Sequence, residues 1–195
     1  MINVHTLPAQ DRPPDGESVW ALDIGFHYML ESSVNIRSQP NLQGAVIGRL
    51  ALHDRIEILD GMPNPQKINN MWAYWYRIRH NNLEGYIWGG FIAKSTLIFD
   101  IDGNGQPDFF QHRITSTAPI VFHLDPERDI FIYINGRRIS TANVGGGGWW
   151  SGVTFEPEDN TVIMTLHTFG ASRSYWIDAN GRIGFIEQLE WESEF

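Results

Sequence analysis

The chain has 195 residues, of which 42% are hydrophobic and 19% are charged, a balance that excludes an intrinsically disordered polypeptide. Acidic residues outnumber basic ones by 23 to 14, and the net charge of −9 disfavours nucleic acid and anionic membranes as partners. Cysteine is absent, which excludes disulfides, thiol nucleophiles and thiolate metal sites.

The residue pattern along the chain predicts an all-β protein. Hydrophobic and polar residues alternate over short stretches, and turn-forming residues, which include 19 Gly and 10 Pro, separate these stretches. We divide the chain into a flexible arm over residues 1–18, a small barrel over residues 19–94 and a β-rich domain over residues 95–195. For the last part we expect an antiparallel sandwich or meander, because hairpin turns join its predicted strands.

The barrel is predicted from short strands joined by tight turns. An alternating strand is expected at Arg55–Leu59, and the proline- and glycine-containing segment Gly61–Gln66 is expected to be a loop. Asn81-Asn82 predicts a hairpin turn between an aromatic-rich strand over Trp72–Ile78 and a return strand over Gly85–Trp88. Five or six such strands within about 65 residues are typical of a small barrel.

Aromatic side chains crowd the second part of this barrel and provide the candidate ligand-binding residues. Tryptophan and tyrosine rings stack on sugars and on peptide backbone, so a groove lined by them would bind glycan or peptide. Strand alternation would place Trp72, Tyr74 and Tyr76 on one face and Trp75 on the other, so one set must form the core. Packing in the core and rim is the alternative interpretation of the cluster. The candidates are Trp72, Tyr74, Tyr76, Tyr86 and Trp88.

Several motifs of the barrel resemble those of bacterial SH3 (SH3b) domains. The run Val34-Asn35-Ile36-Arg37-Ser38-Gln39-Pro40 resembles their opening signature, which typically reads Leu-Asn-Val-Arg-Ser-Gly-Pro. Two departures are Gln39, which stands at the usual glycine, and the segment Gly61–Met71, which is longer than the usual loop of the family. The resemblance covers about residues 26–94. Its other matching segments are residues 46–50, 55–59, 75–78 and 85–87.

This resemblance implies binding without catalysis. SH3b domains usually occur in bacterial envelope and cell-wall proteins, where they recognise peptidoglycan or its stem peptides, or act as adaptors for protein partners. We therefore predict a non-catalytic binding or adaptor protein of the bacterial cell envelope, in the periplasm or outside the cell. Because Met1–Gln10 lacks the features of a signal peptide, a cytoplasmic location stays open. No apolar run reaches the roughly 20 residues of a membrane helix, so membrane insertion is not expected.

Two other functions are alternatives. The two β domains could serve as a structural scaffold that holds partner proteins without any glycan contact. A carboxylate-based cell-wall glycosidase in the second half is a further alternative, since carboxylates from distant strands can meet in a fold. The sequence favours no particular carboxylate pair, and it contains neither a His-x-x-x-His zinc motif nor a Gly-x-Ser-x-Gly elbow. We therefore assign no catalytic residue and do not expect an enzyme.

The sharpest local motif of the second half is the segment Asp100–Asp108. Oxygen-bearing side chains recur at alternate positions, which directs them at one centre, as a hard cation such as calcium requires. Gly105 stands where calcium loops turn sharply. The segment resembles the calcium loops of EF-hand, dockerin and FG-GAP/VCBS proteins and predicts calcium as a cofactor. The candidate ligands are Asp100, Asp102, Asn104, Gln106 through its backbone carbonyl, and Asp108.

The flanks of this segment limit the comparison. Gln111 stands where an EF-hand has a bidentate Glu, and strand-like residues surround the segment in place of helices. The FG-GAP-like comparison is therefore the better one, and it implies a structural role for the ion. The alternative interpretation is a strand–turn–strand connection that Asx turns hold without a metal.

A run of four glycines, residues 145–148, precedes Trp149 and Trp150. Glycines make a mobile loop, and two indoles beside it could clasp a ligand, so both tryptophans join the candidate ligand-binding residues. The alternative interpretation is a long hairpin loop whose tryptophans pack on the sandwich. A phosphate-binding loop is excluded because the run lacks the Gly-Lys-Ser/Thr ending.

Overall fold

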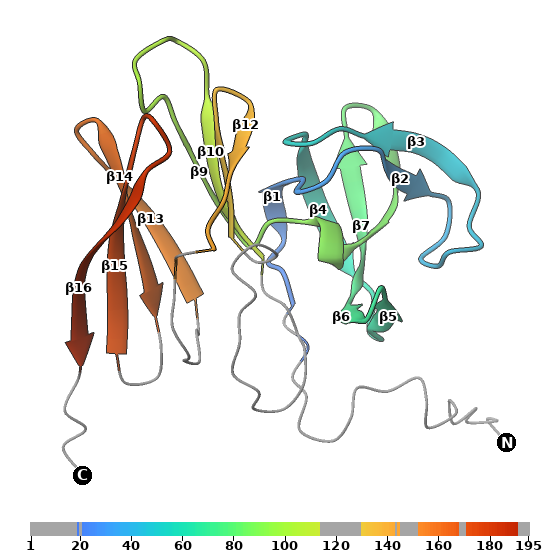
Figure 1. Ribbon diagram of the computed structural model, residues 1–195. Coiled ribbons are helices and arrows are strands. Elements are labelled where there is room, and N and C mark those ends of the chain that lie inside the picture. The colour runs from blue at the N-terminus through green and yellow to red at the C-terminus, as the bar shows by residue number, and fades with distance from the viewer. Residues whose placement is uncertain are drawn as a thin grey trace, which may run out of the picture. The chain divides into compact units, whose positions relative to one another are not determined.

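The computed structural model describes residues 19, 21–113, 130–142, 144, 152–167 and 171–190. Strands make up the regular structure of these residues except for the short 3-10 helix η2 (Gly89–Phe91), which confirms the prediction of an all-β fold (Figure 1). No helix in this part of the chain is long and apolar enough to cross a membrane. The described residues fall into two compact units that divide between Ile92 and Ala93. The predicted arm over residues 1–18 lies outside the described residues.

The first unit is built on one six-stranded antiparallel sheet with the strand order β1-β4-β7-β8-β2-β3. Register shifts interrupt the pairing of β2 with β3 and of β4 with β7, and such bulges increase the twist and bend of a sheet. The strands are β1 (Gly25–Tyr28), β2 (Val34–Arg37), β3 (Val46–Leu50), β4 (Arg55–Gly61), β7 (Trp75–His80) and β8 (Leu83–Trp88).

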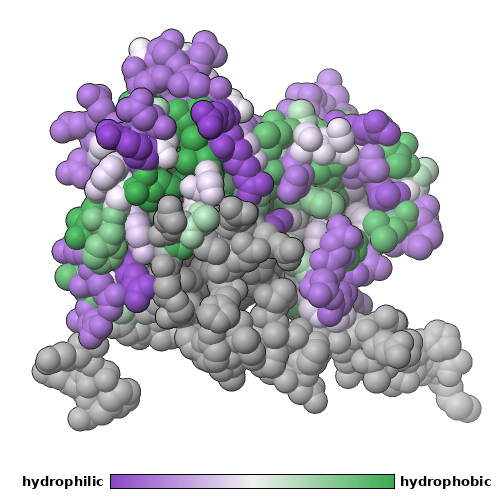
Figure 2. Space-filling model, in the orientation of Figure 1, coloured by the Kyte–Doolittle hydropathy of each residue, from purple (hydrophilic) through white to green (hydrophobic). Residues whose placement is uncertain are grey.

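Alternation along these strands separates a core face from an outer face. On β2, Val34 and Ile36 are buried in the core, whereas Asn35 and Arg37 point the other way and are half-buried. The core of this unit continues through Ile58, Ile78 and Ile87 from β4, β7 and β8. Figure 2 shows hydrophobic surface over the region of β3, where Val46 and Ile47 are exposed.

A small hairpin departs from the expected arrangement. β5 (Gln66–Ile68) and β6 (Met71–Ala73) follow β4 and precede β7 in the sequence, and they pair with each other as a separate two-stranded sheet. The prediction of one strand over residues 72–78 is therefore wrong, because the chain leaves the extended ladder at Tyr74. The carbonyl of Tyr74 instead accepts the N–H of Gly89 at 2.8 Å. As a result, Trp72 and Tyr76 belong to different sheets and do not share one face.

The second unit contains two four-stranded antiparallel sheets, ordered β12-β11-β10-β9 and β13-β14-β15-β16. One continuous core includes residues of both sheets, for example Phe110 and Ile132 from the first and Met164 and Ile177 from the second. This is the architecture of a sandwich. The strands are β9 (Ser95–Phe99), β10 (Asp108–His112), β11 (Ile130–Ile134), β12 (Arg137–Ile139), β13 (Gly152–Glu158), β14 (Thr161–His167), β15 (Ala171–Asp178) and β16 (Ile183–Glu190).

Candidate functional site

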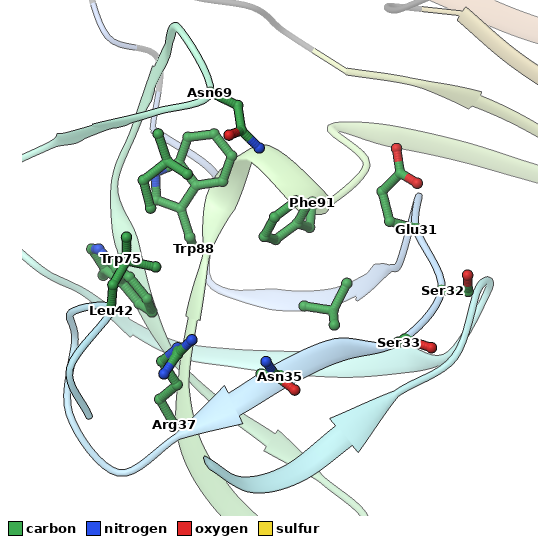
Figure 3. Close-up of a pocket in the computed structure, with 12 residues that line it drawn as sticks. Glu31, Ser32, Ser33, Asn35, Arg37, Leu42, Asn69, Trp75, Trp88 and Phe91 are labelled. Atoms are coloured by element: carbon green, nitrogen blue, oxygen red, sulfur yellow. The ribbon is translucent and has the colours of Figure 1, made fainter. Parts of the chain in front are cut away.

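A pocket of about 610 Å³ opens in the first unit (Figure 3). Its walls come from the segment that leads into β2, from β2 itself, from the β5–β6 turn and from η2. The size and the mixture of aromatic and polar groups are those of a small-ligand or peptide site. The lining residues are Glu31, Ser32, Ser33, Val34, Asn35, Arg37, Leu42, Ile68, Asn69, Trp75, Trp88 and Phe91.

Three aromatic rings line the pocket. Trp75 and Trp88 are direct cross-strand partners on β7 and β8, and both side chains leave the sheet on the face opposite the core residues Ile78 and Ile87. The ring of Phe91, from η2, meets the Trp88 indole edge to face with centroids 5.2 Å apart. The site therefore has a rigid aromatic platform, because strands and a ring contact fix its parts.

Hydrogen bonds from Gln66 hold the two indoles in place. The Trp75 Nε1–H donates to the side-chain oxygen of Gln66 at 2.7 Å, and the Trp88 Nε1–H donates to its main-chain carbonyl at 3.1 Å. Both indole nitrogens are thus satisfied within the protein. Trp75 is 4% exposed and Trp88 is 2% exposed, so only a narrow apolar part of each ring faces the pocket.

Polar side chains surround this aromatic platform. Arg37 donates from Nη1 to the carbonyl of Gly44 at 2.8 Å, which fixes the guanidinium beside the pocket. The Oδ1 atom of Asn35 is buried and has no hydrogen-bond partner among the described residues. Buried amide oxygens are normally paired, so this amide retains capacity for a ligand N–H. Glu31 is exposed and adds one carboxylate to the lining.

The structure brings one of the five described aromatic candidates into this pocket, and that residue is Trp88. Trp72 is buried on the β5–β6 hairpin, with the ammonium of Lys67 5.9 Å from its ring centroid. Tyr74 packs against the core, and Tyr86 is half-buried beside Arg37 on the outer face of the sheet. Trp149 and Trp150 lie outside the described residues.

Tyr76 belongs to the core of the first unit and is 2% exposed. Its hydroxyl oxygen accepts the N–H of Leu22 at 2.8 Å. Burial raises the pKa of the Tyr76 hydroxyl, so the group stays neutral and ties the segment before β1 to the sheet. Its role in the structure is packing, and it does not line the pocket.

Sequence reasoning missed Trp75 as a pocket residue. Trp75 was set apart from its neighbours by alternation alone, and no local signal distinguishes an outer-face tryptophan that lines a pocket from one that packs. The Trp75–Gln66 and Trp88–Gln66 hydrogen bonds span 9 and 22 residues, so a short motif could not reveal them.

The acidic segment after β9 folds into a compact loop. Carboxylate oxygens of Asp100, Asp102 and Asp108 lie within 4.8 Å of one another. Asn104 joins them, since its N–H donates to Asp100 Oδ1 at 3.1 Å and its side-chain amide donates to Asp102 Oδ2 at 3.1 Å. Gln106 is exposed, and its N–H donates to Asn104 Oδ1 at 2.7 Å. Three carboxylates at this spacing are a donor set that suits a hard divalent cation such as calcium.

Asp108 differs from the other two carboxylates because it is fully buried. Its Oδ2 accepts the N–H of Ile101 at 3.1 Å, and its Oδ1 accepts the N–H of Asn135 at 2.8 Å. Asn135 begins the turn between β11 and β12, where Asn135 and Gly136 have φ values of 52° and 71°. Such angles fit the type I′ hairpin turn that the Asn-Gly pair predicts.

Asn135 is a second residue that sequence reasoning missed. Its side-chain amide donates to Asp102 Oδ2 at 2.9 Å, and this hydrogen bond lowers the pKa of the Asp102 carboxyl. The side chains of Asn104 and Asn135 also contact each other. The acidic loop is therefore anchored to a hairpin about thirty residues further along the chain.

Comparison with known protein families gave a match, which covers most of the first unit. Comparisons with curated proteins and with solved structures gave no match. Residues 32–93 match the family model of the bacterial SH3 domain, which covers β2 to η2 and every pocket residue except Glu31. Residues 32–93, about a third of the chain, are therefore similar to a bacterial SH3 domain, and this match supports a binding module.

Proposed function

We propose that this protein acts by binding, without catalysis, and that its SH3 domain holds a peptide in the pocket over Trp75, Trp88 and Phe91. In the bacterial cell envelope, the peptide would be the stem peptide of peptidoglycan. The observation that carries the proposal is a fixed aromatic platform with polar groups around it, because aromatic-lined grooves recognise extended peptides.

The charge distribution supports a ligand without strong net charge. Residues 19–92 contain six acidic and six basic side chains, so the net charge of −9 resides elsewhere in the chain. A neutral domain exerts no long-range attraction on a charged polymer. Affinity would come from ring contact and a few hydrogen bonds, which suits a short peptide of mixed charge.

The location follows from the ligand. Peptidoglycan lies outside the cytoplasmic membrane, so the proposal places the protein in the periplasm or outside the cell. A protein partner that displays a similar peptide is the alternative ligand, and with that ligand the protein would be an adaptor or scaffold.

Retention on insoluble peptidoglycan tests the proposal. The full chain should sediment with intact sacculi, and much less with sacculi whose stem peptides have been removed. Retention no better than that of an unrelated acidic protein would contradict a cell-wall ligand. Equal retention on both preparations would show that the glycan, not the peptide, is bound.

A matched pair of variants connects the binding to the pocket. Leu42 lines the pocket and Val46 does not, yet both side chains are 49% exposed. Leu42→Ala should weaken binding about tenfold, from the loss of apolar contact. Val46→Ala should bind as the unaltered chain does. Equal affinities of the two variants would place the ligand elsewhere.

We also propose that the acidic loop holds one calcium ion as a structural element of the second unit. The close approach of the carboxylates of Asp100, Asp102 and Asp108 supports this proposal. Millimolar calcium should raise the melting temperature of the chain, and Asp102→Asn should remove the increase. The exposed Asp159→Asn, in the β13–β14 turn, is the control. An unchanged melting temperature in calcium would leave the loop as a turn held by its hydrogen bonds.

A further inference from the structure

The β5–β6 hairpin is an addition to the sheet that carries the pocket. β4 and β7 pair directly with each other, so the sheet is continuous without the segment between them. The hairpin pairs only within itself among the sheets described, through Gln66 with Ala73, Lys67 with Trp72 and Ile68 with Met71. Its presence therefore needs an explanation other than the integrity of the sheet.

Gln66 links the hairpin to the aromatic platform. Gln66 accepts one indole N–H with its side chain and the other with its main chain, at 2.7 Å and 3.1 Å. Both tryptophans line the pocket. The position of the hairpin and the orientation of the two rings are consequently coupled.

The turn of the hairpin presents one of its two asparagines to the pocket. Asn69 and Asn70 have φ values of 50° and 67°, left-handed values that asparagine tolerates well. Asn69 lines the pocket, together with the neighbouring Ile68, whereas Asn70 is not part of the lining. In Figure 3, Asn69 lies beside the Trp88 indole at the top of the pocket, and Asn35 lies at the lower edge, near Arg37.

An asparagine amide offers a donor and an acceptor, the same pair that a peptide group offers. Extended peptides direct successive N–H and C=O groups to opposite sides. A peptide over the aromatic platform would therefore meet the amide of Asn69 on one wall and that of Asn35 on the other.

We propose that the β5–β6 hairpin is the specificity-determining wall of this pocket and that the Asn69 side chain hydrogen-bonds a main-chain amide of the bound peptide. Gln66 is the positioning residue of this wall. The proposal rests on the proposed function, since it assumes a peptide over the rings. It adds that the segment between β4 and β7 decides which peptides fit.

Two variants in the same turn test the contact. Glycine at either position keeps the left-handed backbone of the turn. Asn69→Gly should weaken binding of a soluble stem peptide about five- to tenfold, which corresponds to one lost hydrogen bond. Asn70→Gly should bind like the unaltered chain, and both variants should melt within a few degrees of it.

The possible outcomes distinguish failure of the Asn69 contact from failure of the proposed peptide binding. If the unaltered chain binds no peptide, the proposed function fails. If the chain binds and Leu42→Ala weakens binding, but Asn69→Gly and Asn70→Gly bind equally well, the pocket stands and the role of Asn69 is refuted.

The positioning role of Gln66 has its own readout, the hydrogen exchange of the Trp75 indole N–H. Gln66→Leu removes the acceptor, so exchange should become faster and peptide binding weaker. Gln66→Glu keeps an acceptor oxygen and should restore both, while the Trp88 indole keeps its main-chain partner in each variant. Gln43→Leu, on an exposed loop and outside the lining, is the control. Unchanged Trp75 exchange, or unchanged binding, in Gln66→Leu would refute the positioning role.

Discussion

The six-membered ring of the Trp88 indole lies directly against Gly90, where a β-carbon would overlap the ring carbons Cζ3, Cη2 and Cε3. The backbone of Gly90 does not have a left-handed φ, so its requirement is for space alone. The adjacent Gly89 is similar, since a β-carbon there would lie 2.6 Å from Tyr76 Cε2. Gly90 thus allows Trp88 to pack against η2 at the pocket, and Gly89 makes room for the Tyr76 ring.

Gly90→Ala should therefore damage the pocket more than the fold. The added methyl group would displace the Trp88 indole from its packed position, which should lower the unfolding free energy by about 1–3 kcal/mol. Peptide binding should fall below detection because the aromatic platform is broken. The measurements are urea unfolding and peptide titration. Gly152→Ala, where the new β-carbon meets nothing within 4 Å, should change neither quantity, and a similar effect of the two variants would contradict this account.

The hydroxyl of Tyr76 should contribute to stability through one hydrogen bond. Tyr76→Phe leaves the N–H of Leu22 without its acceptor, so the unfolding free energy should fall by about 1 kcal/mol. Tyr86→Phe is a suitable control, because its ring is half-buried and the structure gives its hydroxyl no hydrogen bond to a described residue. Chemical denaturation of both variants measures the difference. Equal losses would mean that the Leu22 contact adds nothing.

The buried carboxylate of Asp108 should stabilise the second unit even when calcium is chelated. Asp108→Asn replaces one of two acceptor oxygens with a donor that faces a backbone N–H, so unfolding free energy should fall by about 1–3 kcal/mol. The exposed Asp102→Asn should cost clearly less. Melting curves in the presence of a chelator test the pair. Equal melting temperatures would show that burial of Asp108 has no energetic consequence.

Stability of the second unit should fall as the pH is lowered from 6.5 to 4. Burial, with Lys94 and Arg113 nearby, lowers the pKa of His112 from 6.5 to about 4. Between pH 6.5 and pH 4, His112 is protonated in the unfolded chain but neutral in the folded chain. The unfolding free energy therefore drops by at most about 3 kcal/mol. Burial also lowers the pKa of His53 to about 4, which gives the first unit the same direction of change.

A variant separates the contribution of His112 from the general effect of acid. Urea unfolding of the second unit, followed through its NMR signals at several pH values, should show a flatter pH dependence for His112→Gln. Ile132→Val, a change in the same core that keeps the histidine, should lower stability but keep the slope. An unaltered slope in His112→Gln would assign the pH dependence to other groups.

Local patterns were sufficient for much of the fold. The Asn81-Asn82 pair specifies a hairpin turn from two adjacent residues, and this turn is confirmed. Alternation identified the strand over Arg55–Leu59 for the same reason, since the signal lies within one strand, and β4 confirms it. The β5–β6 hairpin escaped prediction because Gln66–Ile68 lacks strand-forming alternation and its partner strand was merged with β7.

The site was less accessible from sequence because long-range contacts define it. Trp75 and Trp88 gain their role from Gln66, and Asp108 gains its partner from Asn135, 27 residues away. Composition could show that aromatic residues gather in the barrel, but not which rings face a pocket.

The attachment of the β5–β6 hairpin to Trp88 through a main-chain carbonyl has an evolutionary consequence. The partner of the Trp88 indole is a main-chain carbonyl at position 66, and every amino acid supplies that carbonyl. Mutations can therefore alter the tip of the hairpin while this attachment persists. The domain could in this way acquire new ligands by small steps, with the scaffold beneath the tip left intact.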